Sequence, residues 1–117
     1  MGSIKGRTAI VGIGEIPTGR HADRAAIHFG VESARKAIKD SGIHKDDIDF
    51  VMPTGAVFNG QFNTDLITCR LVEELGLKNV KTNAQVFAGG ASGSCLVKTA
   101  ASLIAAGVAK NVLCIHA

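Results

Sequence analysis

The sequence predicts an α/β fold with a mainly parallel sheet, and two observations lead to that prediction. Short apolar runs rich in β-branched residues alternate along the chain with longer segments whose apolar residues recur at helical spacing. Such alternation implies parallel strands joined by right-handed crossovers, with helices on both faces of the sheet. The chain has 117 residues, 46% of them hydrophobic, which is enough for one domain with a buried core.

The composition excludes several other classes of protein. The apolar content excludes a disordered chain, and the 14 glycines have no period of three, which excludes collagen. No apolar run reaches about 18 residues, so no membrane span is expected. Residues 1–5 lack the apolar core of a secretory signal. The 13 basic and 10 acidic residues are interspersed, so the charge pattern does not predict a nucleic-acid partner.

The N-terminal third predicts one strand and one helix. Residues 8–13, TAIVGI, form a β-branched apolar run that predicts a buried strand ending at Gly14. Residues 21–41 predict a helix, because their apolar positions recur close to every 3.6 residues. Asp23 lies near its start, where a carboxylate favours the helix dipole, and Gly42 is the expected C-cap.

The middle of the chain predicts two further strands with a helix between them. A polar turn over residues 45–49 precedes a strand over residues 50–52. The second helix is expected to run to Leu75, with Gly76 as its stop. Residues 80–87 predict the next strand. Three polar residues are candidate N-caps of the second helix: Asn63, Thr64 and Asp65.

The last helix is the most unusual predicted element. It covers residues 95–109, CLVKTAASLIAAGVA, and precedes a strand over residues 111–115. Lys98 is its only charged residue, and a helix that is apolar nearly all round is buried on all sides. One small sheet does not surround a helix. The sequence therefore predicts a second domain or a partner chain over this helix, and a chain that is incomplete alone.

Histidines, cysteines and carboxylates show no metal-binding spacing. The three cysteines form no Cys-x-x-Cys pair and are predicted to be buried free thiols in a reducing cytoplasm. The histidines share no spacing typical of metal ligands, and the acidic turn is predicted to be solvated. The residues concerned are Cys69, Cys95, Cys114, His21, His28, His44, His116, Asp46, Asp47 and Asp49.

Three motifs with known chemistry are present only in part. Gly12 and Gly14 begin a dinucleotide fingerprint, but Pro17 stands at its third glycine. Ser92 lies at the centre of a partial nucleophile elbow (GxSxG), but Ser94 stands where that motif needs its second glycine. We interpret the first pattern as a turn that ends a strand and the second as a tight turn before a helix. Cys95 lies near a helix start, where packing is favoured over reactivity.

The glycine-rich turn before the last helix is the best candidate site. Glycines let a ligand approach the backbone closely, and the helix start offers free N–H groups and a positive dipole end. Such a turn stabilises an anion, or an oxyanion in acyl chemistry. On chemistry alone, a turn that binds nothing is equally supported. The candidate binding residues are Gly89, Gly90, Ala91, Ser92 and Gly93.

Three segments together resemble a known family: TAIVGIGEIPTGR, AIKDSGIHKDDIDFV and SGSCLVKTAASLIAAGVAKNVLCI. Through them the chain is similar to the N-terminal portion of the thiolase superfamily, most closely its SCP-2-type thiolase-like (lipid-transfer-protein) branch, which includes acetyl-CoA acetyltransferase-like proteins. The resemblance implies a five-layer α/β/α/β/α fold with a central buried helix between two sheets. It also implies an N-terminal extension over residues 1–7 and an incomplete thiolase-like domain over residues 8–117.

One departure from the family pattern bears directly on the chemistry. Gly90 occupies the position where thiolases carry the nucleophilic cysteine, and Phe87 stands where an asparagine is often found. Glycine has no nucleophile, so an acyl-cysteine intermediate is not expected here. The role is not moved to Cys95, and the family's histidine and second cysteine belong to its C-terminal half, outside the matching segments.

The resemblance implies carbon–carbon bond chemistry on a CoA thioester, by acyl transfer or retro-aldol cleavage, without that cysteine. Some thiolase-like steroid side-chain aldolases are of this type and work with an OB-fold/zinc-ribbon partner. The expectations that follow are an acyl-CoA substrate, no tightly bound cofactor, no metal, a homodimer and a cytoplasmic location. The alternative is a non-catalytic acyl-CoA- or lipid-binding subunit, or a scaffold subunit, of a thiolase-like complex.

Overall fold

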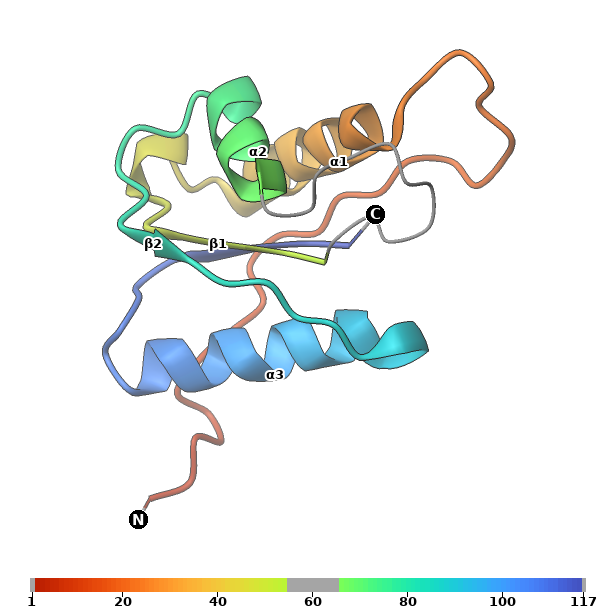
Figure 1. Cartoon of the computed structure of the whole chain (residues 1–117). Helices are drawn as coiled ribbons and strands as arrows, with labels where there is room; N and C mark the ends of the chain where they lie inside the picture. The colour runs from red at the N-terminus through yellow and green to blue at the C-terminus, as the bar shows by residue number, and fades with distance from the viewer. Residues whose placement is uncertain (1, 55–65, 117) are drawn as a thin grey trace.

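A computed structural model describes residues 2–54 and 66–116 as three layers, with one sheet between two helical layers. Helices α1 and α2 cover one face of the sheet, and α3 covers the other (Figure 1). The elements are α1 (Ala26–Ser41), η1 (Lys45–Asp47), β1 (Phe50–Pro53), α2 (Ile67–Leu75), β2 (Thr82–Asn83), η3 (Gly89–Ala91), α3 (Ser92–Ala105) and β3 (Val112–Ile115). The α/β class and the helices on both faces are confirmed.

The described sheet has three strands in the order β2-β1-β3, and both pairings are parallel. Strand β1 is central and fully buried, as a strand covered on both faces must be. The Asp49 carboxylate accepts the backbone N–H groups of Lys110, at 3.0 and 3.1 Å, and of Asn111, at 2.9 Å. These bonds fix the start of β3 beside the start of β1, and they give the acidic turn a structural role.

The sheet divides the core into two parts of unequal size. Successive side chains of β1 point to opposite faces, so Val51 packs under α1 and α2 while Phe50 and Met52 pack against α3. The cluster under α1 and α2 holds eleven buried residues, whereas the cluster under α3 holds five. The α3 side is therefore the thinner part of the core.

The first helix is shorter than the sequence predicts. It begins at Ala26 rather than at residue 21, and Ala25 at its N-cap makes no side-chain capping bond. Asp23 therefore lies outside the helix. The His21 ring packs on Phe29, with centroids 5.2 Å apart, and its Nε2 lies 3.0 Å from the Pro17 carbonyl oxygen, which holds this segment as a loop. Gly42 has φ +70° and caps the helix as predicted.

The strand expected over residues 8–13 is not formed, and this prediction is wrong for the described structure. The segment is extended but makes no ladder with β3, and Ile10, Val11 and Ile13 are 70%, 56% and 76% exposed. A strand exists only through pairing, and the described residues give this one no partner. Ile10, Val11 and Ile13 of this segment are therefore exposed to solvent, although the segment lies beside α1.

Other boundaries move by a few residues. The strand expected over residues 80–87 is reduced to Thr82–Asn83, because only these residues pair with β1. Strand β1 extends to Pro53, and β3 begins at Val112 rather than at residue 111. Helix α2 begins at Ile67, and Gly76, with φ +63°, ends it as predicted. The candidate caps Asn63, Thr64 and Asp65 lie outside the described residues.

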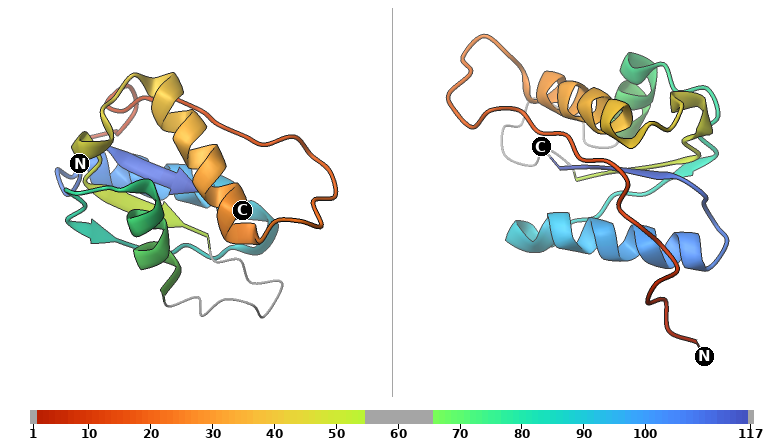
Figure 2. Two further views of the ribbon diagram at one scale, coloured as in Figure 1. Left: turned by 90° about the horizontal axis from the view of Figure 1, so that it is seen from above. Right: turned by 180° about the vertical axis from the view of Figure 1, so that it is seen from behind.

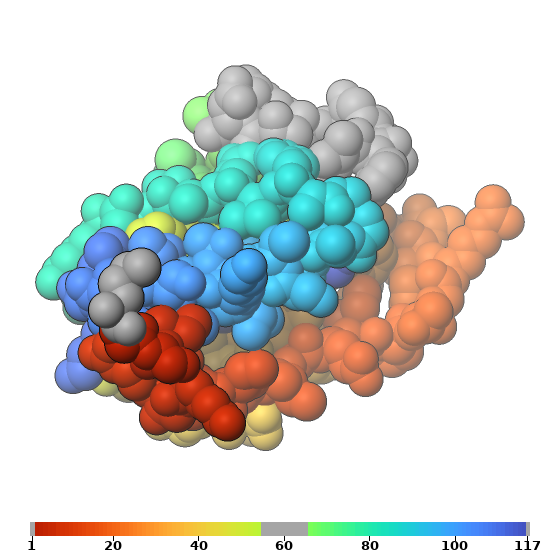
Figure 3. All heavy atoms as spheres, turned by 90° about the horizontal axis from the view of Figure 1, so that it is seen from below, coloured from red at the N-terminus to blue at the C-terminus, as the bar shows by residue number. Residues whose placement is uncertain are grey.

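Helix α3 begins three residues before the predicted start and ends four residues before the predicted end. Gly107, with φ +76°, turns the chain away where a helix was expected to continue. Only Ser92, Leu96 and Ala100 of this helix are buried. Seen from below, α3 spreads across the outer face of the molecule, with the N-terminal segment beside it (Figure 3). Among the described residues, no helix is long and apolar enough to cross a membrane.

Candidate functional site

The glycine-rich turn joins β2 to α3 through the single helical turn η3. Gly89 has φ +55°, a left-handed conformation that favours glycine. Gly90 has no such φ, and a Cβ built on it meets no described atom within 4 Å. Neither the backbone conformation nor the described packing therefore explains why residue 90 has no side chain.

Hydrogen bonds within the turn decide which N–H groups remain for a ligand. Ala91 donates its N–H to the Ala88 carbonyl at 3.1 Å, and Ser92 donates its N–H to the Gly89 carbonyl. The N–H groups of Gly89 and Gly90 precede the first bonded position and have no helical partner. Both residues are exposed, and N–H groups before a helix start are a common place for an anion to bind.

The Ser92 side chain holds the turn together and is not available as a nucleophile. Its Oγ accepts the N–H of Ala88 at 3.0 Å and donates to the Gly89 carbonyl oxygen at 2.8 Å. The residue is 5% exposed. Both hydrogen-bonding roles of the hydroxyl are thus used within the turn. Gly93 lies in the next turn of helix, half-buried, and also has room for a Cβ.

The three cysteines are free thiols, as predicted, but none is fully buried. Cys69 is exposed on α2, and Cys95 is half-buried in the first turn of α3. Cys114 lies in β3 with its Sγ 3.9 Å from the Leu96 carbonyl oxygen, and burial raises the pKa of this thiol to about 11. A thiol with so high a pKa is a poor nucleophile near neutral pH.

The partial dinucleotide motif has a packing explanation that the sequence did not reveal. A Cβ on Gly12 would lie 2.5 Å from the Ala37 carbonyl oxygen, and one on Gly14 would lie 2.2 Å from that of Ser33. Both glycines therefore let the N-terminal segment pass against α1. Among the described residues, no group of three or more histidines, cysteines or carboxylates could hold a metal ion.

Two open depressions lie on the far side of the sheet from the glycine turn, along α1 and α2. Their volumes are about 450 and 420 Å³, and charged side chains line both. Ion pairs cross or border them, among them Arg24–Glu32 and Arg70–Glu74, while Arg35 donates to the Glu74 carbonyl oxygen at 3.0 Å. The depressions lie in the layer of α1 and α2, across the sheet from the glycine turn, and so are not part of that site.

A polar pair that the sequence did not single out lies where β1 and β3 end. Thr54 is 5% exposed, and its Oγ1 lies 3.0 Å from Nδ1 of the exposed His116. The carboxyl ends of these strands and the start of α3 lie at the same end of the molecule, as two opposite views agree (Figures 1 and 2). Open α/β sheets bind ligands at this edge. A polar residue directly after each of two strands was the signal available in the sequence.

No family model matches the chain, but curated proteins do. It is 26% identical over 117 residues to a steroid side-chain-cleaving aldolase of Thermomonospora curvata, covering all of this chain and 28% of the relative. It is 26% identical over 114 residues to a 17-hydroxy-3-oxo-4-pregnene-20-carboxyl-CoA lyase of Mycobacterium tuberculosis, covering 97% of this chain and 28% of that protein. It is 33% identical over 95 residues to a β-ketoacyl-[acyl-carrier-protein] synthase III of Sulfurovum sp., covering 81% of this chain and 27% of the synthase.

The chain thus spans little more than a quarter of each of these relatives. Among solved structures it is similar to an Ltp2-ChsH2(DUF35) aldolase, with a TM-score of 0.75 and 24% identity over 91% of this chain and 26% of that one. It is also similar to a monomeric SCP2-thiolase-like protein type 1 of Mycobacterium smegmatis, with a TM-score of 0.74 and 22% identity over 92% of this chain and 22% of that one. The fold predicted from the sequence is confirmed.

Proposed function

The chain has the fold of the N-terminal portion of thiolase-like proteins, and we propose that it forms the oxyanion-binding part of an enzyme that cleaves a carbon–carbon bond in a CoA thioester. The reaction we favour is retro-aldol cleavage of a β-hydroxyacyl-CoA. The observation that carries the proposal is Gly90, which places an unsubstituted backbone where thiolases have a nucleophilic cysteine. No covalent acyl-enzyme forms at that position.

The glycine turn would act on the charge that develops during cleavage. When the bond between Cα and Cβ breaks, negative charge accumulates on the thioester oxygen as an enolate. We expect the N–H groups of Gly89 and Gly90, which precede the positive end of α3, to donate to that oxygen. Donors of this kind contribute about 100- to 1000-fold each to turnover in enzymes with oxyanion holes. Retro-aldol chemistry needs this and an acid–base group, but no thiolate.

The relatives support the substrate class and suggest a partner. One is a side-chain-cleaving aldolase and another is a lyase of a carboxyl-CoA. A similar structure is that of an Ltp2-ChsH2(DUF35) aldolase. We extend both features to this protein: an acyl-CoA substrate without a tightly bound cofactor, and an OB-fold/zinc-ribbon partner. A homodimer in the cytoplasm completes the proposal.

A non-catalytic acyl-CoA-binding or scaffold subunit is the second candidate. The same Gly90 favours it, because loss of the nucleophile is also what a subunit kept only for binding would show. The enzyme and the acyl-CoA-binding subunit both predict affinity for CoA thioesters and differ in turnover, whereas a scaffold subunit predicts neither. Acyl transfer through a cysteine at this position is disfavoured under both.

Binding and cleavage should be measured on the intact protein, with and without its partner subunit. Thermal unfolding in the presence of CoA and of a β-hydroxyacyl-CoA reports binding, because a ligand at 100 times its Kd stabilises the fold by about 2.7 kcal/mol. Chromatography of the CoA products reports cleavage. Binding with release of a shortened acyl-CoA supports the enzyme. Binding without cleavage supports the acyl-CoA-binding subunit. A protein that neither binds nor cleaves contradicts both the enzyme and the binding subunit and leaves the scaffold subunit.

A further inference from the structure

We propose that Thr54 and His116 form the acid–base pair of this site, with His116 exchanging the proton and Thr54 positioning its ring. The proposal rests on the function proposed above and names a residue for the step that the glycine turn does not perform. The turn offers donors to an oxyanion, but it holds no side chain that takes up a proton. The strand ends on the same side of the sheet provide one.

The placement of the pair follows from the sheet. Thr54 directly follows β1 and His116 directly follows β3, and these strands pair in parallel up to Pro53 opposite Ile115. The two residues are therefore brought together although 62 positions separate them in sequence. Both lie at the carboxyl edge of the sheet, the edge at which α3 begins (Figures 1 and 2). A substrate held at the turn thus lies toward the edge that presents His116.

The burial of the two residues fits different roles. Thr54 is 5% exposed, and its backbone N–H donates to the Ile115 carbonyl oxygen at 2.8 Å, so its hydroxyl has a fixed position. His116 is exposed, and among the described residues it forms no ion pair. With Nδ1 held by Thr54, the free Nε2 is the nitrogen that meets a ligand.

The Thr54 hydroxyl has two partners, and this allows His116 to act in both directions. Its Oγ1 lies 3.0 Å from Nδ1 of His116 and 3.5 Å from the Ile115 carbonyl oxygen. When the hydroxyl donates to the carbonyl, Nδ1 carries the proton and the neutral ring has a basic Nε2. Once Nε2 has taken up a proton, both ring nitrogens are donors, and the hydroxyl still accepts from Nδ1 while it donates to the carbonyl. One arrangement of the hydroxyl therefore holds both the neutral ring, which is the base, and the imidazolium, which is the acid.

The proton balance of the cleavage closes with this one histidine. Nε2 takes the proton of the substrate's β-hydroxyl, and the O–H electron pair forms the carbonyl of the departing ketone or aldehyde. The Cα–Cβ bond breaks, and its electron pair forms the thioester enolate at the glycine turn. The imidazolium then returns the proton to Cα, which yields the shortened acyl-CoA and neutral His116. No oxidant, metal or second co-reactant enters the balance.

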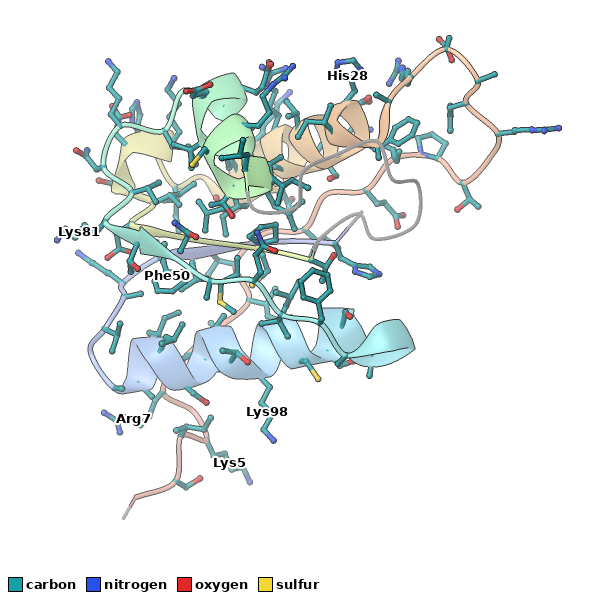
Figure 4. All side chains as sticks on the ribbon, in the orientation of Figure 1. Lys5, Arg7, His28, Phe50, Lys81 and Lys98 are labelled. Atoms are coloured by element: carbon teal, nitrogen blue, oxygen red, sulfur yellow. The ribbon has the colours of Figure 1, made fainter. Side chains whose placement is uncertain are left out.

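The test compares His116→Gln with His28→Gln in the intact protein. His28 is an exposed histidine on α1, on the opposite face of the sheet (Figure 4), and serves as the matched control. We expect His116→Gln to lower kcat by about 100-fold or more, to leave the Kd for CoA thioesters unchanged, and to remove one titrating group from the pH profile of kcat. His28→Gln should match the wild type.

The role of Thr54 is tested separately, because this residue acts only by positioning the His116 ring. Thr54→Val should lower kcat about fivefold and change the pH profile, and Thr54→Ser should restore both. A His116→Gln enzyme with wild-type kcat and pH profile overturns this inference and leaves the proposed function standing. A wild-type protein that cleaves no β-hydroxyacyl-CoA overturns the proposed enzyme, and the inference with it.

Discussion

Gly89 and Gly90, which precede α3, differ in whether the backbone conformation requires a glycine. Gly89 adopts φ +55°, which a side chain at that position would strain. Gly90 adopts no left-handed conformation, and its Cβ position is open among the described residues. Backbone strain and contacts among the described residues therefore account for Gly89 but not for Gly90, where the proposed function needs an open backbone.

Alanine substitutions at residues 89 and 90 should distinguish the strained backbone of the first from the unstrained backbone of the second. Gly89→Ala should lower the free energy of unfolding by about 1–2 kcal/mol, because alanine resists the left-handed region. Gly90→Ala should change it by less than about 0.5 kcal/mol, as expected for an unstrained surface position. Urea unfolding of the two variants and the wild type measures both. Equal destabilisation by both variants would contradict the distinction.

The thiols should react in the order of their exposure and pKa. Cys69 is exposed, whereas burial raises the pKa of Cys114 from an ordinary value of 9.0 to about 11. At pH 8.5 we expect iodoacetamide to modify Cys69 and to spare Cys114, because only the thiolate attacks. Mass spectrometry of the alkylated peptides gives the order. Modification of Cys114 as fast as Cys69 at that pH would contradict it.

The same shift predicts a pH dependence of stability. The folded pKa lies above the unfolded value, so the contribution of the neutral Cys114 thiol is fully present below about pH 9. It is lost as the pH rises toward about 11. The variant Cys114→Ala should therefore lose less stability than the wild type between pH 9 and 11.

Among the elements, the N-terminal segment is held by close contact with α1 rather than by strand pairing. Gly12 and Gly14 bring its backbone against the carbonyls of Ala37 and Ser33, and the Ile13 N–H donates to the Asp40 carboxylate at 2.9 Å. Gly12 and Gly14 are required because a side chain would clash with α1, and not because of a left-handed backbone conformation.

Alanine at these positions should loosen the segment. Gly12→Ala and Gly14→Ala should each cost about 1–3 kcal/mol of stability, since the added methyl meets a helix backbone that does not yield. Gly19→Ala is the matched control, because the nearest described atom to its Cβ is 3.8 Å away. Thermal unfolding measures the cost, and hydrogen exchange of residues 8–13 shows whether the segment detaches. Wild-type values for Gly14→Ala would contradict the packing.

Element types were more predictable from the sequence than element ends. Glycine C-caps predicted two helix ends correctly, at Gly42 and Gly76, because the left-handed conformation is a local property. The strand over residues 8–13 was predicted from its β-branched run, yet pairing is not local, and the described residues provide no partner. The end of α3 was misplaced because Gly107 was included in the helix rather than recognised as its stop.

In the molecule as a whole, the outer face of α3 is left exposed by the described residues. Val97 and, just after the helix, Val108 are 43% and 56% exposed. Lys5, Arg7 and Lys98 project from this side of the molecule (Figure 4). The relatives are more than three times as long as the matched region. For the proposed enzyme we therefore expect an additional layer over α3.

A lysine substitution on the exposed face of α3 tests whether a further layer covers this helix. In the intact protein, Val97→Lys should lower the free energy of unfolding by several kcal/mol, because the covered position would bury an unpaired ammonium group. Leu66→Lys, at a 59% exposed residue beside α2 in the opposite layer, should change it by less than about 0.5 kcal/mol. Equal effects of the two variants in thermal unfolding would show that α3 has no such cover.

The site was only partly predictable from the sequence. The glycine turn could be found because its residues are contiguous, and the departure at Gly90 could be found through the resemblance. Which N–H groups remain free depends on the hydroxyl of Ser92 and on where η3 begins, which only the structure provides. The pair of Thr54 and His116 depends on the pairing of β1 with β3 across 62 residues.

Carbon–carbon cleavage without a covalent acyl-enzyme can be observed on the protein during turnover. The intact protein is mixed with a β-hydroxyacyl-CoA, quenched during turnover, and analysed by mass spectrometry for both small products and protein mass. We expect a shortened acyl-CoA and a ketone or aldehyde, with no mass added to the protein. A protein carrying the acyl group during turnover would contradict it.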